Sequence, residues 1–297
     1  DLVKLHPAFL FMMSIIILAL IGTGLLMLPE MSTVANGLPF IDAFFTSVSC
    51  VSVTGLSTID IYSVLTFKGQ LVLLGLMKLG GLNIIAFGAL TLIIAKFGVS
   101  IKYHQVIEDF VNRDSLSDTT MLSKIIKWSL GIEILGAIAY FIGFGNKGVF
   151  SSFADRLYYS IFHSVSAFNS AGFSTFKNGF MNANVVNNNF VLLTTTFLIF
   201  FGGFGMIYLF DMFSREKLRE RMIYPWKTIS FGTKISLYFS ILLLFGGAVL
   251  FYLIEKNNSL DGLPILEQLN RSLFMSMTTR SGGLSVIPIA VLKIPML

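Results

Sequence analysis

A short stretch rich in Ser, Thr, Asn and Gly follows an apolar run at three places in this sequence. The three copies are FFTSVSCVSVTGLS (44–57), IFHSVSAFNSAGFS (161–174) and SLFMSMTTRSGGLS (272–285). The first two align without a gap, whereas the third is one residue shorter before its glycine. Gly55, Gly172 and Gly283 lie 117 and 111 residues apart, which indicates an internal repeat.

Backbone carbonyl oxygens are the groups in these stretches that could do chemistry. Glycine adopts dihedral angles that aim successive carbonyls in one direction, and a ring of carbonyls can replace the hydration shell of a monovalent cation. The candidate ion ligands are Ser52, Val53, Thr54, Gly55, Asn169, Ser170, Ala171, Gly172, Ser281, Gly282 and Gly283. Ordinary Gly/Ser turns between helices are the alternative, but three copies in one context favour an ion filter.

The rest of the chain has the composition of a helical membrane protein. Of its 297 residues, 55% are hydrophobic and 12% are charged, and the mean hydropathy is +0.79. Apolar runs approach the roughly 20 residues needed to cross a bilayer. The predicted spans are Ala8–Leu28, Gly69–Ala95, Ile125–Phe144, Asn189–Phe213 and Ile235–Ile254. The first is longer than the apolar part of a secretory signal and lacks a convincing cleavage site.

Basic residues set the expected orientation of these spans. The segment 214–234 carries six Lys or Arg against two Glu, and Lys4, Lys96 and Lys127 fall on the same side if the spans alternate. The positive-inside rule makes that side, and the N-terminus, cytoplasmic in a cell membrane. The net charge of +5 then reflects orientation and gives no basis for a nucleic-acid partner.

Each copy of the repeat is preceded by a predicted span and a short apolar segment, and the first two are followed by a returning span. The short segments have about 10–14 residues, half of what a crossing helix needs. Asp42, Asp155 and Glu267 lie near their starts, where a carboxylate suits a helix N-terminus. We therefore predict an all-α membrane protein of repeated helix, pore-helix, filter-loop and helix units, divided as 1–100, 101–217 and 218–297.

Several charged or reactive residues need a separate interpretation. Lys78 and Glu133 are isolated charges within predicted spans; pairing with each other is favoured over a role of Lys78 alone beside the filter. Packing or a local hydrogen bond fits His163 better than metal binding. Asn169 either supplies an oxygen near the filter or caps the preceding helix. The single Cys50 excludes an intramolecular disulfide, and no enzyme motif or cofactor site is expected.

The motifs SVSCVSVTGLST, FHSVSAFNSAGFST and TTRSGGLS resemble the first three pore loops of the Trk/Ktr/HKT superfamily of potassium and sodium transport proteins. The resemblance runs from the first span to the C-terminus and is strongest to bacterial KtrB-type membrane subunits. It implies four units around one pore, a homodimer, and a cytosolic ring of nucleotide-binding regulatory subunits. It also implies that Gly55 favours K⁺ as the transported ion, and that Arg280 supports the third loop.

The sequence departs from that family pattern at its end. About two and a half units precede Leu297, so the third returning helix, its gating loop and the fourth unit cannot be located, and a fragment is expected. Two rival functions stay open beside a channel-like potassium subunit. One is a Na⁺-permeable or ion-coupled secondary transporter with broken helices, and the other is an inactive structural subunit.

Overall fold

The computed structural model describes residues 7–98, 118–145, 150 and 152–293. Within them the chain is helical and has no β-strand, only an isolated bridge between Ser32 and Leu65. The long helices are α1 (Pro7–Leu26), α4 (Phe67–Gly98), α6 (Asp118–Phe144), α9 (Asn189–Phe204) and α12 (Phe231–Glu255). The shorter ones are α2 (Phe40–Val51), α3 (Ile61–Val64), α7 (Phe153–Phe168), α8 (Ala183–Val186), α10 (Met206–Phe213), α11 (Arg215–Ile223) and α13 (Ile265–Met277).

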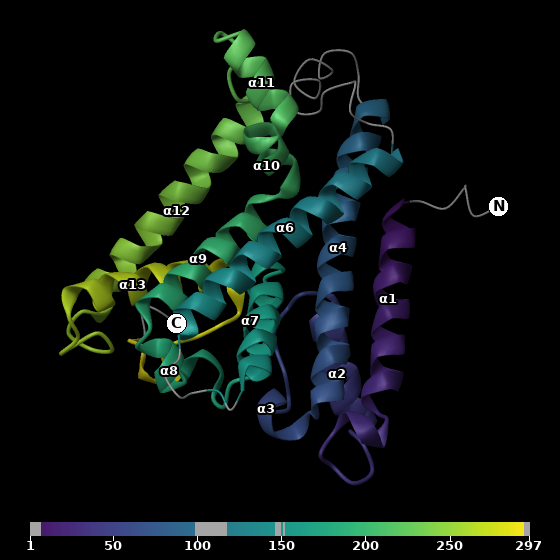
Figure 1. Ribbon diagram of the computed structural model, residues 1–297, viewed down its shortest axis with the longest axis vertical. Coiled ribbons are helices and arrows are strands. Elements are labelled where there is room, and N and C mark those ends of the chain that lie inside the picture. The colour runs from purple at the N-terminus through teal and green to yellow at the C-terminus, as the bar shows by residue number, and fades with distance from the viewer. Residues whose placement is uncertain (1–6, 99–117, 146–149, 151, 294–297) are drawn as a thin grey trace.

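Each short helix packs against long helices that are close to it in the chain. Helix α2 packs on α1 and α4, α7 packs on α6 and α9, and α13 packs on α12 and α9. Contacts between α4 and α7 join the first set to the second. In Figure 1 the short helices α2, α7 and α13 lie in the lower half of the molecule, whereas the basic helix α11 lies at the opposite end.

Two described helical segments are long and apolar enough to cross a membrane, Ser123–Phe144 and Phe231–Glu255. Shorter apolar helical segments are Phe11–Leu26, Phe40–Val51 and Asn189–Phe204. Exposed Leu, Ile and Phe side chains cover the outer faces of α1 and α12, as expected for helices that contact lipid. The predicted connection 96–124 lies mostly outside the described residues.

One predicted membrane span is broken into two helices. The sequence predicts a single helix over Asn189–Phe213, but the helix ends at Phe204 and restarts at Met206. Gly205 between them has φ 95° and ψ 130°, a combination that glycine adopts readily and other residues do not. Hydropathy does not detect this break, because the residues on both sides of Gly205 are apolar.

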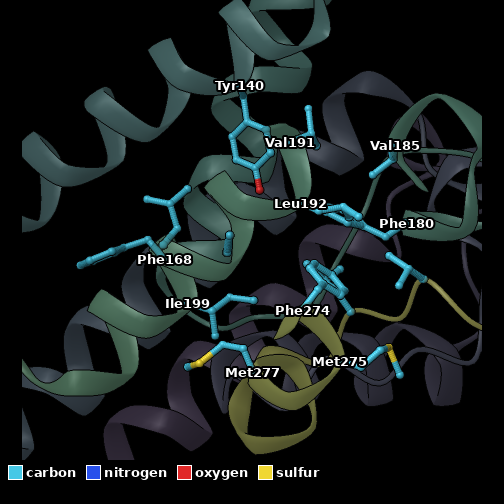
Figure 2. Packing of buried hydrophobic residues seen from close by; sticks show 14 of the residues in the cluster. Tyr140, Phe168, Phe180, Val185, Val191, Leu192, Ile199, Phe274, Met275 and Met277 are labelled. Atoms are coloured by element: carbon cyan, nitrogen blue, oxygen red, sulfur yellow. The ribbon is translucent and has the colours of Figure 1, made fainter. Parts of the chain in front are cut away.

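The largest buried cluster lies where α6, α7, α9 and α13 meet. Figure 2 shows Ile199 of α9 among Phe168 of α7 and the α13 residues Phe274 and Met277. Tyr140 of α6 is fully buried, and its hydroxyl lies 2.6 Å from Thr195 Oγ1. This packing holds the ends of α7 and α13 in fixed positions, which matters because the glycine stretches follow directly.

The short helices begin as the sequence predicts. Asp42, Asp155 and Glu267 each lie in the first turn of their helix. Ser152 caps α7, since its Oγ accepts a hydrogen bond from the N–H of Asp155 at 3.1 Å. At 16 residues, α7 is longer than the predicted 10–14.

Candidate ion-binding site at the glycine loops

We call residues 52–55, 169–172 and 280–283 the glycine loops. The first begins where α2 ends in two hydrogen bonds that run back into the helix. The N–H of Val53 donates to the carbonyl of Cys50 at 3.3 Å, and the N–H of Thr54 donates to that of Ser49 at 2.9 Å. This pattern satisfies the last carbonyls of a helix and requires a left-handed residue, usually glycine. Val53 occupies that position, with φ 57°.

The second glycine loop has the same backbone. The N–H of Ser170 donates to the carbonyl of Ala167 at 3.1 Å, and that of Ala171 donates to Ser166 at 2.8 Å. Ser170 has φ 54°, matching Val53 in the first loop. A β-branched residue such as valine is rare in this conformation, and such outliers cluster at functional sites.

The third glycine loop reaches its glycine by a different path. Residues 278–282 form one π-helical turn, and the N–H of Gly283 donates to the carbonyl of Thr278 at 3.3 Å. Gly283 itself is left-handed, with φ 66°. The third loop, which is one residue shorter, therefore also ends in a left-handed glycine but reaches it through a π-helical turn.

The three glycines meet backbone to backbone. A methyl group placed on Gly172 would lie 3.0 Å from Gly55 Cα and 3.2 Å from Gly283 Cα. One placed on Gly283 would lie 3.2 Å from Gly172 Cα and 3.8 Å from Gly55 Cα. All three have positive φ, with 79° at Gly55 and 73° at Gly172. Any side chain here would therefore be strained and would enter the space where the loops converge.

Carbonyl oxygens of the preceding residues line this meeting point. The methyl position of Gly55 lies 2.8 Å from Ala171 O, that of Gly172 lies 3.2 Å from Gly282 O, and that of Gly283 lies 3.7 Å from Thr54 O. In the described part of the chain, none of these three oxygens accepts a backbone hydrogen bond from a turn or loop. Each of these oxygens comes from a different glycine loop.

Side-chain hydrogen bonds connect the first glycine loop to the end of α2. Ser52 Oγ donates to the carbonyl of Val48 at 2.7 Å and lies 2.7 Å from Thr54 Oγ1. Ser49 Oγ accepts the N–H of Leu56, the residue after Gly55, at 2.8 Å. In the second loop, Ser166 occupies the equivalent position, but its Oγ donates to the carbonyl of Phe173 at 2.6 Å.

Asn169 caps α7, which is one of its two predicted roles. Its Nδ2 donates to the carbonyl of Val165 at 2.9 Å and also to Glu133 Oε1 at 2.9 Å. Its Oδ1 is buried without a hydrogen-bond donor among the described residues, and a methyl group on Gly81 would overlap it. Asn169 therefore connects the second loop to both α6 and α4.

The predicted pairing of Lys78 with Glu133 is confirmed. Lys78 Nζ on α4 lies 2.7 Å from Glu133 Oε1 on α6, and also donates to Ser129 Oγ at 2.6 Å. The side chains are 17% and 6% exposed. Because Glu133 also accepts from Asn169, one buried carboxylate joins α4, α6 and the second glycine loop. A role in ion passage stays a prediction.

Residues of the third loop face other helices. The Arg280 side chain is exposed and its Nη1 donates to the carbonyl of Ser240 on α12 at 3.2 Å. Ser281 Oγ lies near α9, since a methyl group on Gly203 would be 3.5 Å away. Arg280 therefore holds the loop against α12, while its functional importance stays a prediction.

His163 has the local hydrogen bonds that the sequence predicts. His163 Nδ1 lies 2.7 Å from the carbonyl of Tyr159, and Nε2 lies 2.9 Å from Ser174 Oγ. Nδ1 must carry the proton for the first bond, so Nε2 accepts from Ser174. Cys50 is buried and its Sγ donates to the carbonyl of Leu73 at 3.3 Å.

Sequence reasoning missed two glycines that bring the returning helices against the loops. A methyl group on Gly80 of α4 would overlap the carbonyl of Val51, and one on Gly202 of α9 would overlap that of Phe168. Val51 and Phe168 are the last residues of the short helices α2 and α7. The available signal was a Gly-Gly pair in each returning helix, in LGGLN and FGGFG.

Comparison with known proteins identifies the family of this chain. Residues 7–295 match the family model described as TrkH, cation transport protein. The chain is 31% identical over 284 residues to Ktr system potassium uptake protein B of Bacillus subtilis (strain 168), covering 95% of this chain and 60% of that protein. It is 32% identical over 282 residues to potassium/sodium uptake protein NtpJ of Enterococcus hirae, covering 94% and 60%.

A solved structure has the same fold. The potassium transporter TrkH from Vibrio parahaemolyticus superposes with a TM-score of 0.66 at 18% sequence identity, covering 93% of this chain and 51% of that one. The chain thus spans about 60% of the length of the curated relatives it matches. The likenesses and the spanning-length helices place it in a membrane. Because the family model matches nearly the whole sequence, the chain belongs to the TrkH family of cation transport proteins.

Proposed function

We propose that this chain is part of a potassium transport subunit of the cell membrane, in which the glycine loops form three sides of an ion filter. The observation that carries the proposal is the convergence of Gly55, Gly172 and Gly283 with carbonyl oxygens between them. Carbonyl oxygens can replace the water around a dehydrated K⁺ ion. The three glycine loops contain no Asp or Glu, which favours backbone oxygens over carboxylates as the ligands.

The packing of the helices supports a unit of outgoing helix, pore helix, glycine loop and returning helix. Under this proposal the units are residues 1–100, 101–217 and 218–297. Helices α2, α7 and α13 are the pore helices, and their C-terminal ends carry partial negative charge toward the ion. A fourth unit would supply the remaining side of the filter.

The names of the relatives support part of the proposed assembly. Relatives named as Ktr system proteins support a membrane subunit that works with a regulatory partner. We propose a homodimer on a cytosolic ring of nucleotide-binding subunits, with the N-terminus and the basic helix α11 on the cytoplasmic side. Passage down the electrochemical gradient is favoured because each proposed unit starts on the same side, whereas transporter repeats are commonly inverted.

Sodium transport is the second candidate function. One relative is named a potassium/sodium uptake protein, so its closeness to this chain keeps sodium open as a substrate. The resemblance to the Trk/Ktr/HKT superfamily implies that Gly55 favours potassium, and a side chain at this position would lie against the carbonyl oxygen of Ala171.

The test is growth in low potassium of bacterial cells that lack their own uptake systems. The full-length protein should support growth, whereas Gly55→Asp, expressed to the same level, should not. Gly55→Ser should support growth but admit more Na⁺ relative to K⁺. Gly75→Ala is the matched control, because a methyl group on Gly75 has no neighbour within 4 Å.

The outcomes separate the candidates. Growth with the full-length protein and with Gly75→Ala, but not with Gly55→Asp, supports potassium passage at Gly55. If Gly55→Ser leaves the K⁺/Na⁺ selectivity unchanged, the assignment of Gly55 to the filter is wrong. If the full-length protein never supports growth, even with a regulatory subunit supplied, the sodium or inactive-subunit function is favoured.

A further inference from the structure

One contact between a short helix and the long helix before it occurs three times. In each case a serine hydroxyl on the short helix donates to a backbone carbonyl of the long helix. The three bonds are Ser47 Oγ to Ala19 O (2.7 Å), Ser164 Oγ to Glu133 O (2.7 Å) and Ser276 Oγ to Leu244 O (2.8 Å). All three serines are buried.

A glycine lies opposite each serine. A methyl group placed on Gly22, Gly136 or Gly247 would overlap Oγ of the facing serine. Each glycine is three residues after the carbonyl that accepts the bond. A helix carbonyl has a second lone pair beside its intrahelical hydrogen bond, but a side chain from a neighbouring helix reaches it only where the surface leaves room.

The contact is close to the glycine loops. Ser47 and Ser164 each lie eight residues before the loop glycine, and Ser276 lies seven before Gly283. The serine hydrogen bond therefore fixes how far each short helix is shifted along the axis of its long helix. A shift of one helix by a single residue moves its end by about 1.5 Å, enough to misplace carbonyls that must contact one ion.

We propose that Ser47, Ser164 and Ser276 are positioning residues, each of which holds one pore helix at the depth where its loop carbonyls face the ion. This inference rests on the proposed function. None of the three serines touches the ion; they act through the short helices. A purely structural role would lower the amount of folded protein without changing which ion passes.

The pair Gly247 and Ser276 gives the sharpest test. A methyl group on Gly247 would meet only Ser276 within 4 Å, overlapping Oγ and lying 3.3 Å from Cβ, whereas the other two glycines also face a leucine. The variants are Gly247→Ala, Ser276→Ala and the double variant. The matched control is Gly246→Ala, the preceding residue of α12, where a methyl group has no neighbour within 4 Å.

The measurement is rubidium uptake by cells expressing the full-length protein, with Na⁺ as competitor and with the amount of folded protein in the membrane determined in parallel. Overpacking of a well-packed contact moves backbone, so Gly247→Ala should lower uptake per folded molecule by about tenfold and lower the Rb⁺/Na⁺ selectivity ratio. The double variant should return to the level of Ser276→Ala alone, because removing Oγ makes room for the methyl group. Gly246→Ala should match the unmodified protein.

Two results would overturn the positioning role while leaving the proposed function intact. One is equal uptake and selectivity in Gly246→Ala and Gly247→Ala. The other is unchanged selectivity in Ser276→Ala and the double variant, with any loss explained by less folded protein. If Gly247→Ala does not fold, the Rb⁺/Na⁺ selectivity ratio of Ser276→Ala still tests the positioning role. A lower ratio supports the role, and an unchanged ratio overturns it. Absence of rubidium uptake by the unmodified protein would instead remove the proposed function, and this inference with it.

Discussion

The buried pair of Lys78 and Glu133 makes a quantitative prediction about stability. The charged atoms are 2.7 Å apart, and the side chains are 17% and 6% exposed. Removing one partner leaves the other charge buried among apolar helices, which costs about 3–5 kcal/mol. Lys78→Met and Glu133→Gln should each lower the free energy of unfolding by that amount.

The double variant should lose much less than the sum of the two single losses. Replacing both partners of a buried ion pair by neutral residues of similar size is often nearly neutral. We therefore expect a coupling energy of about 3 kcal/mol between positions 78 and 133. Gln at position 133 can still accept the amide hydrogen of Asn169, so contact with the second glycine loop is retained.

The assay is reversible unfolding of the purified protein in mixed detergent micelles, analysed as a double-mutant cycle. The control is the exposed pair of Lys68 and Glu30, whose side chains are 63% and 70% exposed. Solvent-exposed pairs of this kind contribute about 0–1 kcal/mol, so Lys68→Met should change little. Equal effects of Lys78→Met and Lys68→Met, or strictly additive losses in the cycle, would refute the reasoning.

Two backbone substitutions give further predictions, both measured by the same unfolding assay. Val53→Gly should raise the unfolding free energy by up to about 2 kcal/mol, because release of left-handed strain at φ 57° exceeds the entropy that glycine loses on folding; a loss of stability would contradict this. Gly205→Ala should cost about 1–3 kcal/mol, since φ 95° is open to glycine alone. The control Gly246→Ala should be neutral or slightly stabilising, as alanine favours a helix.

The repeat in the sequence was sufficient to predict where the backbone becomes irregular. Gly55, Gly172 and Gly283 all have positive φ, as expected of glycines after apolar helices. The ion pair was also predictable, because an isolated charge in an apolar helix needs a partner and the sequence offers Lys78 and Glu133. These inferences depend on residue type and on local sequence, and both can be read directly from the amino-acid sequence.

Other features depend on contacts between distant segments and could not be predicted. The helix break at Gly205 lies in a continuous apolar run, so hydropathy joins its two sides. The serine–glycine contacts have no constant spacing, because the loops between the long and short helices differ in length: Gly22 precedes Ser47 by 25 residues, whereas Gly247 precedes Ser276 by 29. Only the packed helices reveal that these pairs are equivalent.

The different endings of the three short helices have a consequence for how the protein can change. Two end in a left-handed Val or Ser, and the third ends in a π-helical turn. In a ring of identical chains, one mutation alters every side of the central opening together. Here the three glycine loops are encoded separately and differ in backbone, so natural selection can adjust one loop at a time. A substitution tolerated in one loop is therefore no guide to its effect in another.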